Sequence, residues 1–247
     1  MHALIACAML LTISTLANAA TTIPDANTLI VDGVTYRLEG IDAPQTDQVC
    51  ADAAGARWWC GVEARDKLKE RVGNRSVRCD EKGRDRTFKE RRVGICWIED
   101  EKTSVNQWLV REGWALNASP RGGFNTEQEQ ARQDRKGLWK GCFVAPEEFR
   151  RGKKDGPLLG GSCPAERDRE IRDVLFPDDL AMPAGCNIKG KFAVRARVTG
   201  NLGIYHLQAC RSYPGLTNPD RWFCSEEDAQ AAGFRRAYNC RPGAKSK

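Results

Sequence analysis

Histidine is nearly absent from this sequence. Its 247 residues include two, His2 and His206. His2 lies in an N-terminal segment that we expect to be removed, and His206 lies far from the motifs described below. Mechanisms that need a pair of histidines or a histidine nucleophile are therefore excluded from the first part of the chain. A site there must work through carboxylates, arginines and a metal ion.

Long apolar runs are equally scarce. The one such run extends from Ala3 to Leu11 and is followed by Leu16-Ala17-Asn18-Ala19, the small-residue pattern of a signal-peptide cleavage site. It is too short to span a membrane, although Lys and Arg are missing from its start. We expect residues 1–19 to be a secretory signal peptide and the protein to be exported, to the periplasm or the medium. No other segment is apolar enough to cross a bilayer.

Cysteine, by contrast, is frequent. One of the eleven cysteines is Cys7, in the expected signal peptide, so an even number remains. In an exported chain this favours disulfides over free thiols. Cys50 and Cys60 flank a short loop, and Cys79 and Cys96 fall on two expected strands, so we expect pairing within each set. The sequence leaves open the pairing of the remaining six, Cys142, Cys163, Cys186, Cys210, Cys224 and Cys240.

The net charge is +6, and the basic residues are unevenly spread. Lys and Arg outnumber Asp and Glu between Glu63 and Arg92, most densely after Lys82. For residues 60–72 we expect a solvent-exposed helix face with charges of both signs, and not a binding surface. For the denser segment we expect contact with a polyanion, through Arg84, Arg86, Lys89, Arg91 and Arg92.

Hydrophobic periodicity predicts an α+β fold. Apolar residues at helical spacing predict helices at 61–72, 103–112 and 126–136, the last opened by a capping box of Thr126 and Glu129. Strands are expected at 28–32, 34–41, 76–80 and 92–98. Asp32-Gly33 between two β-rich runs predicts a tight hairpin.

The C-terminal third has a different composition. Residues 151–183 are polar and Gly-rich, which predicts a linker. Residues 184–247 are expected to form a small Cys-rich module with two or three strands and a helix capped by Ser225. A tetrahedral zinc site from Cys186, His206, Cys210 and Cys224 is conceivable, but the spacing is loose and the compartment oxidising. We therefore expect disulfides rather than zinc in this module.

Three ordered motifs give the chain its organisation. The first is Asp25-Ala26-Asn27-Thr28, the second is Arg37-Leu38-Glu39-Gly40-Ile41-Asp42-Ala43-Pro44-Gln45, and the third is Thr87-Phe88-Lys89-Glu90-Arg91, which precedes Arg92-Val93-Gly94-Ile95-Cys96. Over residues 22–150 they resemble the staphylococcal nuclease family, calcium-dependent phosphodiesterases. The resemblance implies a five-stranded OB-fold barrel packed by about three helices, with the small Cys-containing module that is appended to many bacterial relatives.

The resemblance also implies residue roles. Arg37 and Arg91 match the two arginines that contact phosphate, and Asp42 matches a calcium ligand. Gln45 stands where the family has its glutamate base, and an amide cannot accept a proton from water at neutral pH. Asn27 replaces the second calcium aspartate. Ala43 replaces the residue that is threonine in the nuclease itself, and Glu90 replaces a glycine in the loop before Arg91.

Two functions follow from this pattern. One is an exported protein that binds DNA, RNA or another acidic polymer through an arginine clamp, with hydrolysis weak or lost. The alternative is an active endonuclease that uses calcium. Glu39 or Asp47, both near Gln45 in the sequence, could replace the missing base, but their positions cannot be predicted. The departures at Gln45 and Asn27 favour binding over cleavage.

Overall fold

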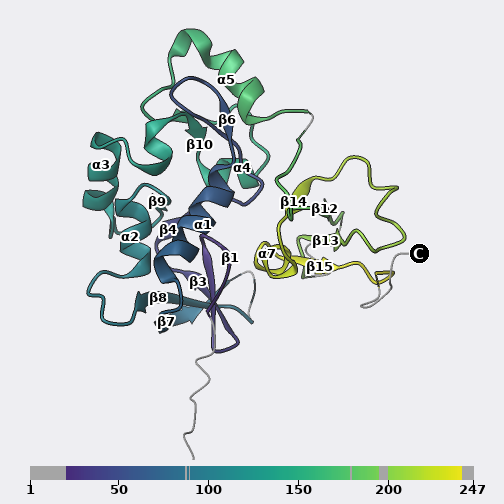
Figure 1. The fold of residues 1–247 in the computed structure, drawn as a ribbon, viewed down its shortest axis with the longest axis horizontal. Helices are drawn as coiled ribbons and strands as arrows, with labels where there is room; N and C mark the ends of the chain where they lie inside the picture. Colours follow the sequence, from purple (N-terminus) through teal and green to yellow (C-terminus); the bar gives the residue numbers. More distant parts are fainter. Residues whose placement is uncertain (1–20, 87, 89, 179, 195–199, 241–247) are drawn as a thin grey trace, which may run out of the picture.

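The fold was analysed in a computed structural model of the chain. The structure describes residues 21–86, 88, 90–178, 180–194 and 200–240. The expected signal peptide and Lys89 lie outside these residues. Figure 1 shows a larger part, from the N-terminal strands to α5, beside a smaller part that holds the last strands and α7.

A five-stranded sheet forms the centre of the larger part. Its order is β1-β2-β3-β8-β7, with antiparallel neighbours except for the parallel pair β3 and β8. The β2–β3 hairpin turns through Asp32 and Gly33, both at positive φ (51° and 77°), as the sequence predicts. The strands are β1 (Thr22–Asp25), β2 (Thr28–Val31), β3 (Val34–Leu38), β7 (Val77–Arg84) and β8 (Arg92–Ile98).

The sheet has five strands, as the resemblance implies, but over the part of the chain that the structure describes it does not close into a complete barrel. Among the described residues β1 and β7 each pair on one side only, so they form the two edges. The expected class, α+β, is correct, and an OB fold is itself a five-stranded and partly open barrel. At the edge, β7 extends to Arg84, and its last four residues are exposed although they lie opposite the β8 residues that also pair with β3.

Three helices lie close to the predicted ranges; α1 and α2 pack against the sheet, and α3 packs against α2. α1 (Cys60–Val72) buries Ala64, Leu68 and Val72, the face that periodicity predicts. α2 (Val105–Arg111) is capped by the hydroxyl of Ser104, which accepts from Gln107 N. α3 (Asn125–Gln133) begins one residue before Thr126, so the predicted capping box is wrong, because Thr126 lies inside the helix.

Short elements complete the larger part. β4 pairs with β9, β5 with β6, and β10 with β11. Their bounds are β4 (Ile41–Asp42), β5 (Cys50–Ala51), β6 (Arg57–Trp58), β9 (Leu116–Asn117), η1 (Gly137–Lys140), β10 (Phe143–Val144), α4 (Pro146–Arg150), β11 (Leu158–Leu159), η2 (Ala165–Arg167) and α5 (Asp168–Leu175).

The segment expected to be a linker contains defined structure. β11 pairs with β10, and α5 buries Ile171 and Leu175 in a cluster with Cys142 and Val144. The Cys142–Cys163 disulfide ties the segment to the larger part. The chain up to Leu175 therefore packs on the larger part. The predicted linker boundaries, residues 151 and 183, remain a prediction.

The smaller part is a four-stranded sheet covered by a helix. The strand order is β14-β12-β13-β15, and only β13 and β15 run parallel. Ser225 caps α7 by accepting from Asp228 N, as predicted. The elements are β12 (Ile188–Phe192), β13 (Gly203–His206), β14 (Arg221–Phe223), α7 (Glu226–Ala231) and β15 (Phe234–Arg236). We call residues 184–240 the C-terminal module.

Five disulfides join the ten cysteines of the described residues. Cys50–Cys60 and Cys79–Cys96 are the two pairings that the sequence favours. The other three are Cys142–Cys163, Cys186–Cys224 and Cys210–Cys240. His206, the fourth residue of the conceivable zinc set, contacts Ser212 Oγ through Nδ1 at 2.8 Å. Within the described part of the chain, no helix is long and apolar enough to span a membrane.

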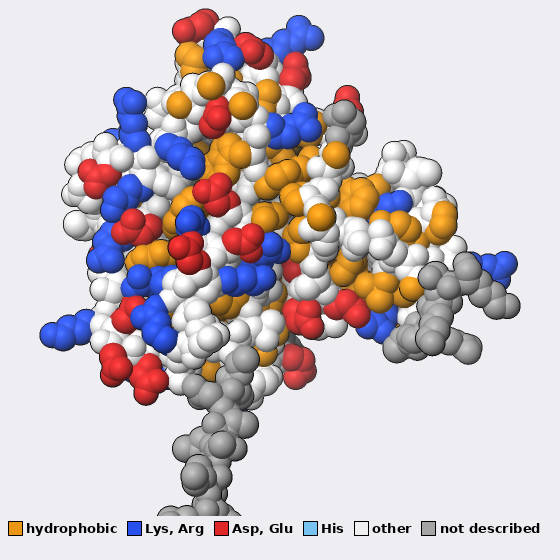
Figure 2. Space-filling model, viewed as in Figure 1, with side chains coloured by type: hydrophobic (Ala, Val, Ile, Leu, Met, Phe, Trp, Pro, Cys, Tyr) orange, Lys and Arg blue, Asp and Glu red, His pale blue; other side chains and the backbone are white. Residues whose placement is uncertain are grey.

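Charges of both signs alternate on the surface. Figure 2 shows Lys, Arg, Asp and Glu side chains intermixed over the larger part, whereas hydrophobic side chains gather near the junction of the two parts and on the smaller one. The face in this view is therefore not a uniformly basic surface. An anion would therefore bind at a local concentration of arginines and not over this whole face.

Candidate functional site

The three sequence motifs meet at one cavity. Its volume is about 600 Å³, and residues from the N-terminal strands, α4 and the C-terminal module surround it. Six arginines and three carboxylates line it, so its wall is rich in positive charge. The charged lining residues are Arg37, Arg84, Arg86, Arg91, Arg150, Arg221, Asp25, Glu39 and Asp85.

Arg37 differs from Arg91, Arg150 and Arg221 of this wall, each of which forms an ion pair with an acidic side chain. β3 carries it opposite Thr28 of β2. Among the described residues, its guanidinium makes no hydrogen bond and no ion pair. Burial lowers the pKa of Arg37, and although Asp42 opposes this, nearby arginines add to it. Arg37 is thus a desolvated cation that faces a cavity, which favours binding of an anion.

Arg91 is buried and held in place. Its Nη2 lies 2.7 Å and its Nε 3.1 Å from Asp85 Oδ2, and Nη1 donates to the carbonyl of Ala231 in α7 at 2.6 Å. The guanidinium also lies 4.8 Å from the ring centre of Phe88. Arg91 is therefore fixed from both parts of the protein, and Asp85 offsets part of its charge.

The other predicted anion-binding residues divide into two groups. Arg84 and Arg86 line the cavity with Arg91. Arg92 does not line it, because its side chain forms an ion pair with Glu81. Of the two adjacent arginines, Arg91 is therefore the one at the cavity. Lys89 lies outside the described residues.

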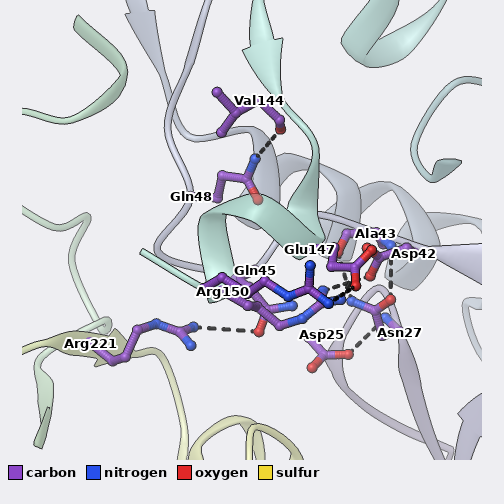
Figure 3. A network of polar contacts seen from close by, with 11 residues as sticks. Asp25, Asn27, Asp42, Ala43, Gln45, Gln48, Val144, Glu147, Arg150 and Arg221 are labelled. Atoms are coloured by element: carbon purple, nitrogen blue, oxygen red, sulfur yellow. Dashed lines mark hydrogen bonds and ion pairs between the residues drawn. The ribbon is translucent and has the colours of Figure 1, made fainter. Parts of the chain in front are cut away.

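Asp42, the expected calcium ligand, is bound to an arginine. Both of its carboxylate oxygens accept from Arg150 of α4, at 2.6 and 3.1 Å (Figure 3). Asp42 is 7% exposed, whereas the Arg150 side chain is 31% exposed, so the carboxylate is buried and the guanidinium still reaches water. Arg150 was not predicted from the sequence, since it is 108 residues away along the chain.

Asn27 and Ala43 fasten the first two motifs together. The Asn27 amide donates to Ala43 O at 2.9 Å and accepts from Ala43 N at 2.8 Å. Asp25 Oδ1 in turn accepts from Asn27 N at 2.7 Å, as Figure 3 shows. These are backbone-pairing contacts, and they occupy the amide oxygen that Asn27 would offer to a cation.

The residues present do not fit a calcium ion. Asp42 is paired with Arg150, the Asn27 oxygen is paired with Ala43 N, and Ala43 has no side-chain oxygen. In residues 21–240, so far as the structure describes them, no three His, Cys, Asp or Glu side chains are grouped to hold a metal. Calcium prefers six to eight oxygen ligands with several carboxylates, and this arrangement places a guanidinium beside the main one.

Gln45, at the position of the family base, also lies on the cavity wall. It is 7% exposed, and its Oε1 is 3.5 Å from Arg221 Nη2, a long contact. Arg221 comes from β14 and is bound mainly to Asp47, at 2.6 and 2.7 Å. Burial lowers the pKa of Arg221, but the charge and hydrogen bonds of Asp47, together with the charges of Asp228 and Asp25, outweigh this, and the pKa is raised.

The structure distinguishes the candidate replacement bases. Asp47 is committed to Arg221 and also accepts from Trp222 N at 3.0 Å. Glu39 is exposed and lines the cavity. Asp25, which the sequence reasoning did not consider, is buried and lines the same cavity as Gln45. The one sequence feature that could have indicated Asp25 as a site residue is its position two residues before Asn27.

Other contacts at the site come from distant parts of the chain. Gln48, just after this motif, donates to Val144 O at 2.9 Å (Figure 3) and so ties the loop to β10. The C-terminal module contributes Phe192, Leu202 and Phe234 to the cavity wall. No local pattern in the sequence relates these residues to the nuclease-like motifs.

This geometry agrees with what a family comparison finds. Residues 35–141 match the model of the staphylococcal nuclease homologues, so this part of the chain is a staphylococcal nuclease-like domain. Arg37, Asp42, Gln45 and Arg91 fall within the match, whereas Arg150 and the C-terminal module lie beyond it.

A relative with a printed function was also found. The succinoglycan biosynthesis protein ExoI of Rhizobium meliloti (strain 1021) is 34% identical over 119 residues. The alignment covers 47% of this chain and 61% of the relative. The similarity thus extends over one segment of each protein.

Proposed function

We propose that this is an exported nuclease-like protein that binds nucleic acid, or a similar polyanion, through Arg37 and Arg91, and that hydrolyses it weakly or not at all. The observation that carries the proposal is the state of Arg37, a half-buried guanidinium on the cavity wall without an ion pair among the described residues. A phosphate or carboxylate would supply the missing counter-charge.

Weak hydrolysis follows from the residues around Arg37. Gln45 cannot act as a general base, and the loss of such a base lowers rates by roughly 10²–10⁴-fold. Arg150 holds Asp42, so the carboxylate expected to bind calcium is already neutralised. Binding therefore needs no metal, and we expect it to weaken with salt, because phosphate contacts release counterions.

Active cleavage is the second candidate, and Asp25 supports it. This carboxylate and Glu39 line the same cavity as Arg37, Arg91 and Gln45. An acid in this position could accept the proton from water in place of the family glutamate. If it does, hydrolysis depends on Asp25 or Glu39 and not on Gln45.

Binding is tested with single-stranded DNA and RNA, by fluorescence anisotropy with and without calcium. We expect Arg37→Ala to weaken binding by about 10- to 100-fold, the loss typical of a charge-assisted contact. Arg111→Ala is the matched control, since Arg111 is partly exposed and pairs with Glu112 away from the cavity. Equal affinities of wild type and Arg37→Ala would refute the proposed clamp.

Hydrolysis is tested on the same substrates with calcium. We expect little or no cleavage by the wild type, and increased cleavage by Gln45→Glu if the loss of the base is the main defect. Wild-type cleavage that disappears in Arg37→Ala and in Asp25→Asn would establish the second candidate instead.

The ligand class is wider than nucleic acid alone. The relative in Rhizobium meliloti is named for succinoglycan biosynthesis, so an acidic polysaccharide is a reasonable second ligand to assay. Export is supported by the five disulfides, since such bonds persist in oxidising compartments.

A further inference from the structure

The C-terminal module makes the apolar side of the cavity. Phe192 ends β12, Leu202 precedes β13 and Phe234 begins β15, and all three line the cavity that Arg37 and Arg91 line. We call these three residues the apolar wall. One cavity thus combines guanidinium groups from the nuclease-like domain with apolar groups from the module.

The apolar wall is incompletely covered. Phe192 is 45% and Leu202 40% exposed, and they are two of the four large hydrophobic side chains that are exposed in the described residues. The others, Val194 and Tyr238, do not line the cavity. Exposed apolar groups gathered beside a polar site indicate a surface that a ligand covers.

Phe192 is a supported platform. Its ring centre lies 5.5 Å from that of Phe234, which in turn packs against Phe223 at 4.9 Å. Phe223 and Phe234 are buried in the core of the module. One side of Phe192 is therefore supported by the buried Phe234 ring, while nearly half of its surface is open.

The module is held against the nuclease-like domain by buried contacts. Arg221 and Asp47 form a buried ion pair, and Thr46 donates to Asp228 Oδ2 at 2.6 Å. Arg91 also donates to Ala231 O. These contacts fix the position of the apolar wall relative to the arginine side of the cavity.

We propose that the apolar wall is a base-stacking subsite, so that the ligand is a nucleotide unit with its phosphate at Arg37 and Arg91 and its base against Phe192. This rests on the proposed binding function and deepens it. A polyanion without a flat apolar face would satisfy the arginines and leave Phe192 exposed. A cavity of about 600 Å³ lies within the roughly 300–1,000 Å³ range of small-ligand sites.

The test compares two oligomers of equal charge: a four-residue oligothymidylate and the same backbone with every base removed. Stacking on an aromatic side chain strengthens binding by about 5- to 100-fold per base. We expect wild type to prefer the oligothymidylate by at least about fivefold, and Phe192→Ala to bind both oligomers nearly equally. Phe192→Tyr should retain the preference.

Tyr238→Ala is the matched control, because Tyr238 is an exposed aromatic residue of the module outside the cavity. It should leave the preference unchanged, and circular dichroism should show that all variants are folded. Equal binding of both oligomers by wild type, or tighter binding of an acidic oligosaccharide of equal charge, would overturn the subsite. Failure of wild type to bind any of these ligands would instead overturn the proposed function.

Discussion

Asp42 and Arg150 form a bidentate ion pair, with oxygen–nitrogen distances of 2.6 and 3.1 Å, at the position where the family resemblance implies a calcium ligand. Arg150 comes from α4, beyond the matched domain. A guanidinium that holds this carboxylate competes directly with a cation, since both need the same oxygens.

Removal of the Arg150 guanidinium should therefore create calcium affinity. We expect Arg150→Ala to bind calcium weakly, with a dissociation constant of about 10⁻³ M. The double variant Arg150→Ala, Asn27→Asp should bind it more tightly, because a carboxylate is added. Bound calcium stabilises the folded state, so millimolar calcium should raise the melting temperature of these variants and not that of the wild type. Calorimetry gives the affinities.

Arg151→Ala is the control for this experiment. Arg151 is the next residue along the chain, is exposed, and pairs with Glu147 and Glu148 instead of Asp42. It should respond to calcium as the wild type does. Calcium binding by the wild type itself, at an affinity that Arg150→Ala does not improve, would contradict the competition between the two cations.

Local sequence patterns predicted the framework of this site well. The positive φ values of Asp32 and Gly33 produce the β2–β3 turn, and this register places Arg37 opposite Thr28. The α1 face of Ala64, Leu68 and Val72 is buried as its spacing predicts. In each case the residues that decide the structure are neighbours in the sequence.

The counter-charges of the site could not be predicted in this way. Arg150 meets Asp42 across 108 residues, and Arg221 meets Asp47 across 174. Periodicity describes one element at a time and carries no information on such partners. The sequence likewise does not show which of the adjacent residues Arg91 and Arg92 faces the cavity; contacts with Asp85 and Ala231 hold Arg91 there.

Asp228 should make stability depend on pH. It is buried between the module and the domain, and desolvation, with the charge of Asp25, raises its pKa to about 7. Asp47 also faces it, and the hydroxyl of Thr46 donates to it. Because the folded state holds this proton more tightly than the unfolded one, the contribution of Asp228 to stability is greatest below about pH 4 and falls as pH rises to about 7.

This effect is measured as the free energy of unfolding from pH 4 to pH 8. We expect ionisation of Asp228 to lower the free energy of unfolding by a few kcal/mol over this range. This loss should be absent from Asp228→Asn, so the difference in free energy of unfolding between the two proteins should change as pH rises. Asp173→Asn, an exposed acid on α5, is the control. A difference that is constant with pH would contradict the raised pKa.

The disulfides should matter most in the C-terminal module. Its cores are small, one around Tyr205 and Phe223 and one around Cys210 and Cys240. Loss of a native disulfide in a small domain costs about 2–5 kcal/mol. We expect Cys210→Ser with Cys240→Ser to increase proteolysis and hydrogen exchange in residues 203–240 while exchange in β2 and β3 is unchanged.

A thiol titration of unreduced, denatured protein provides the complementary measurement. The structure pairs every cysteine of residues 21–240, so we expect no free thiol in protein that lacks residues 1–20. Two thiols in the wild type, or equal exchange throughout the double serine variant, would contradict the arrangement.

The Arg221–Asp47 ion pair should couple the C-terminal module to the domain. Both side chains are almost fully buried, so removal of one leaves an uncompensated charge. We expect Arg221→Met or Asp47→Leu alone to destabilise the protein by about 3–5 kcal/mol, whereas the double variant should recover much of this loss, because apolar groups of similar size often replace a buried ion pair without cost. A double-mutant cycle by urea unfolding gives the coupling.

Lys191→Met and Asp220→Leu, which break an exposed ion pair in the module, form the control cycle and should show less than about 1 kcal/mol of coupling. Additive effects at Arg221 and Asp47 would show that the module is held by its other contacts, at Thr46 and Ala231, and not by this pair.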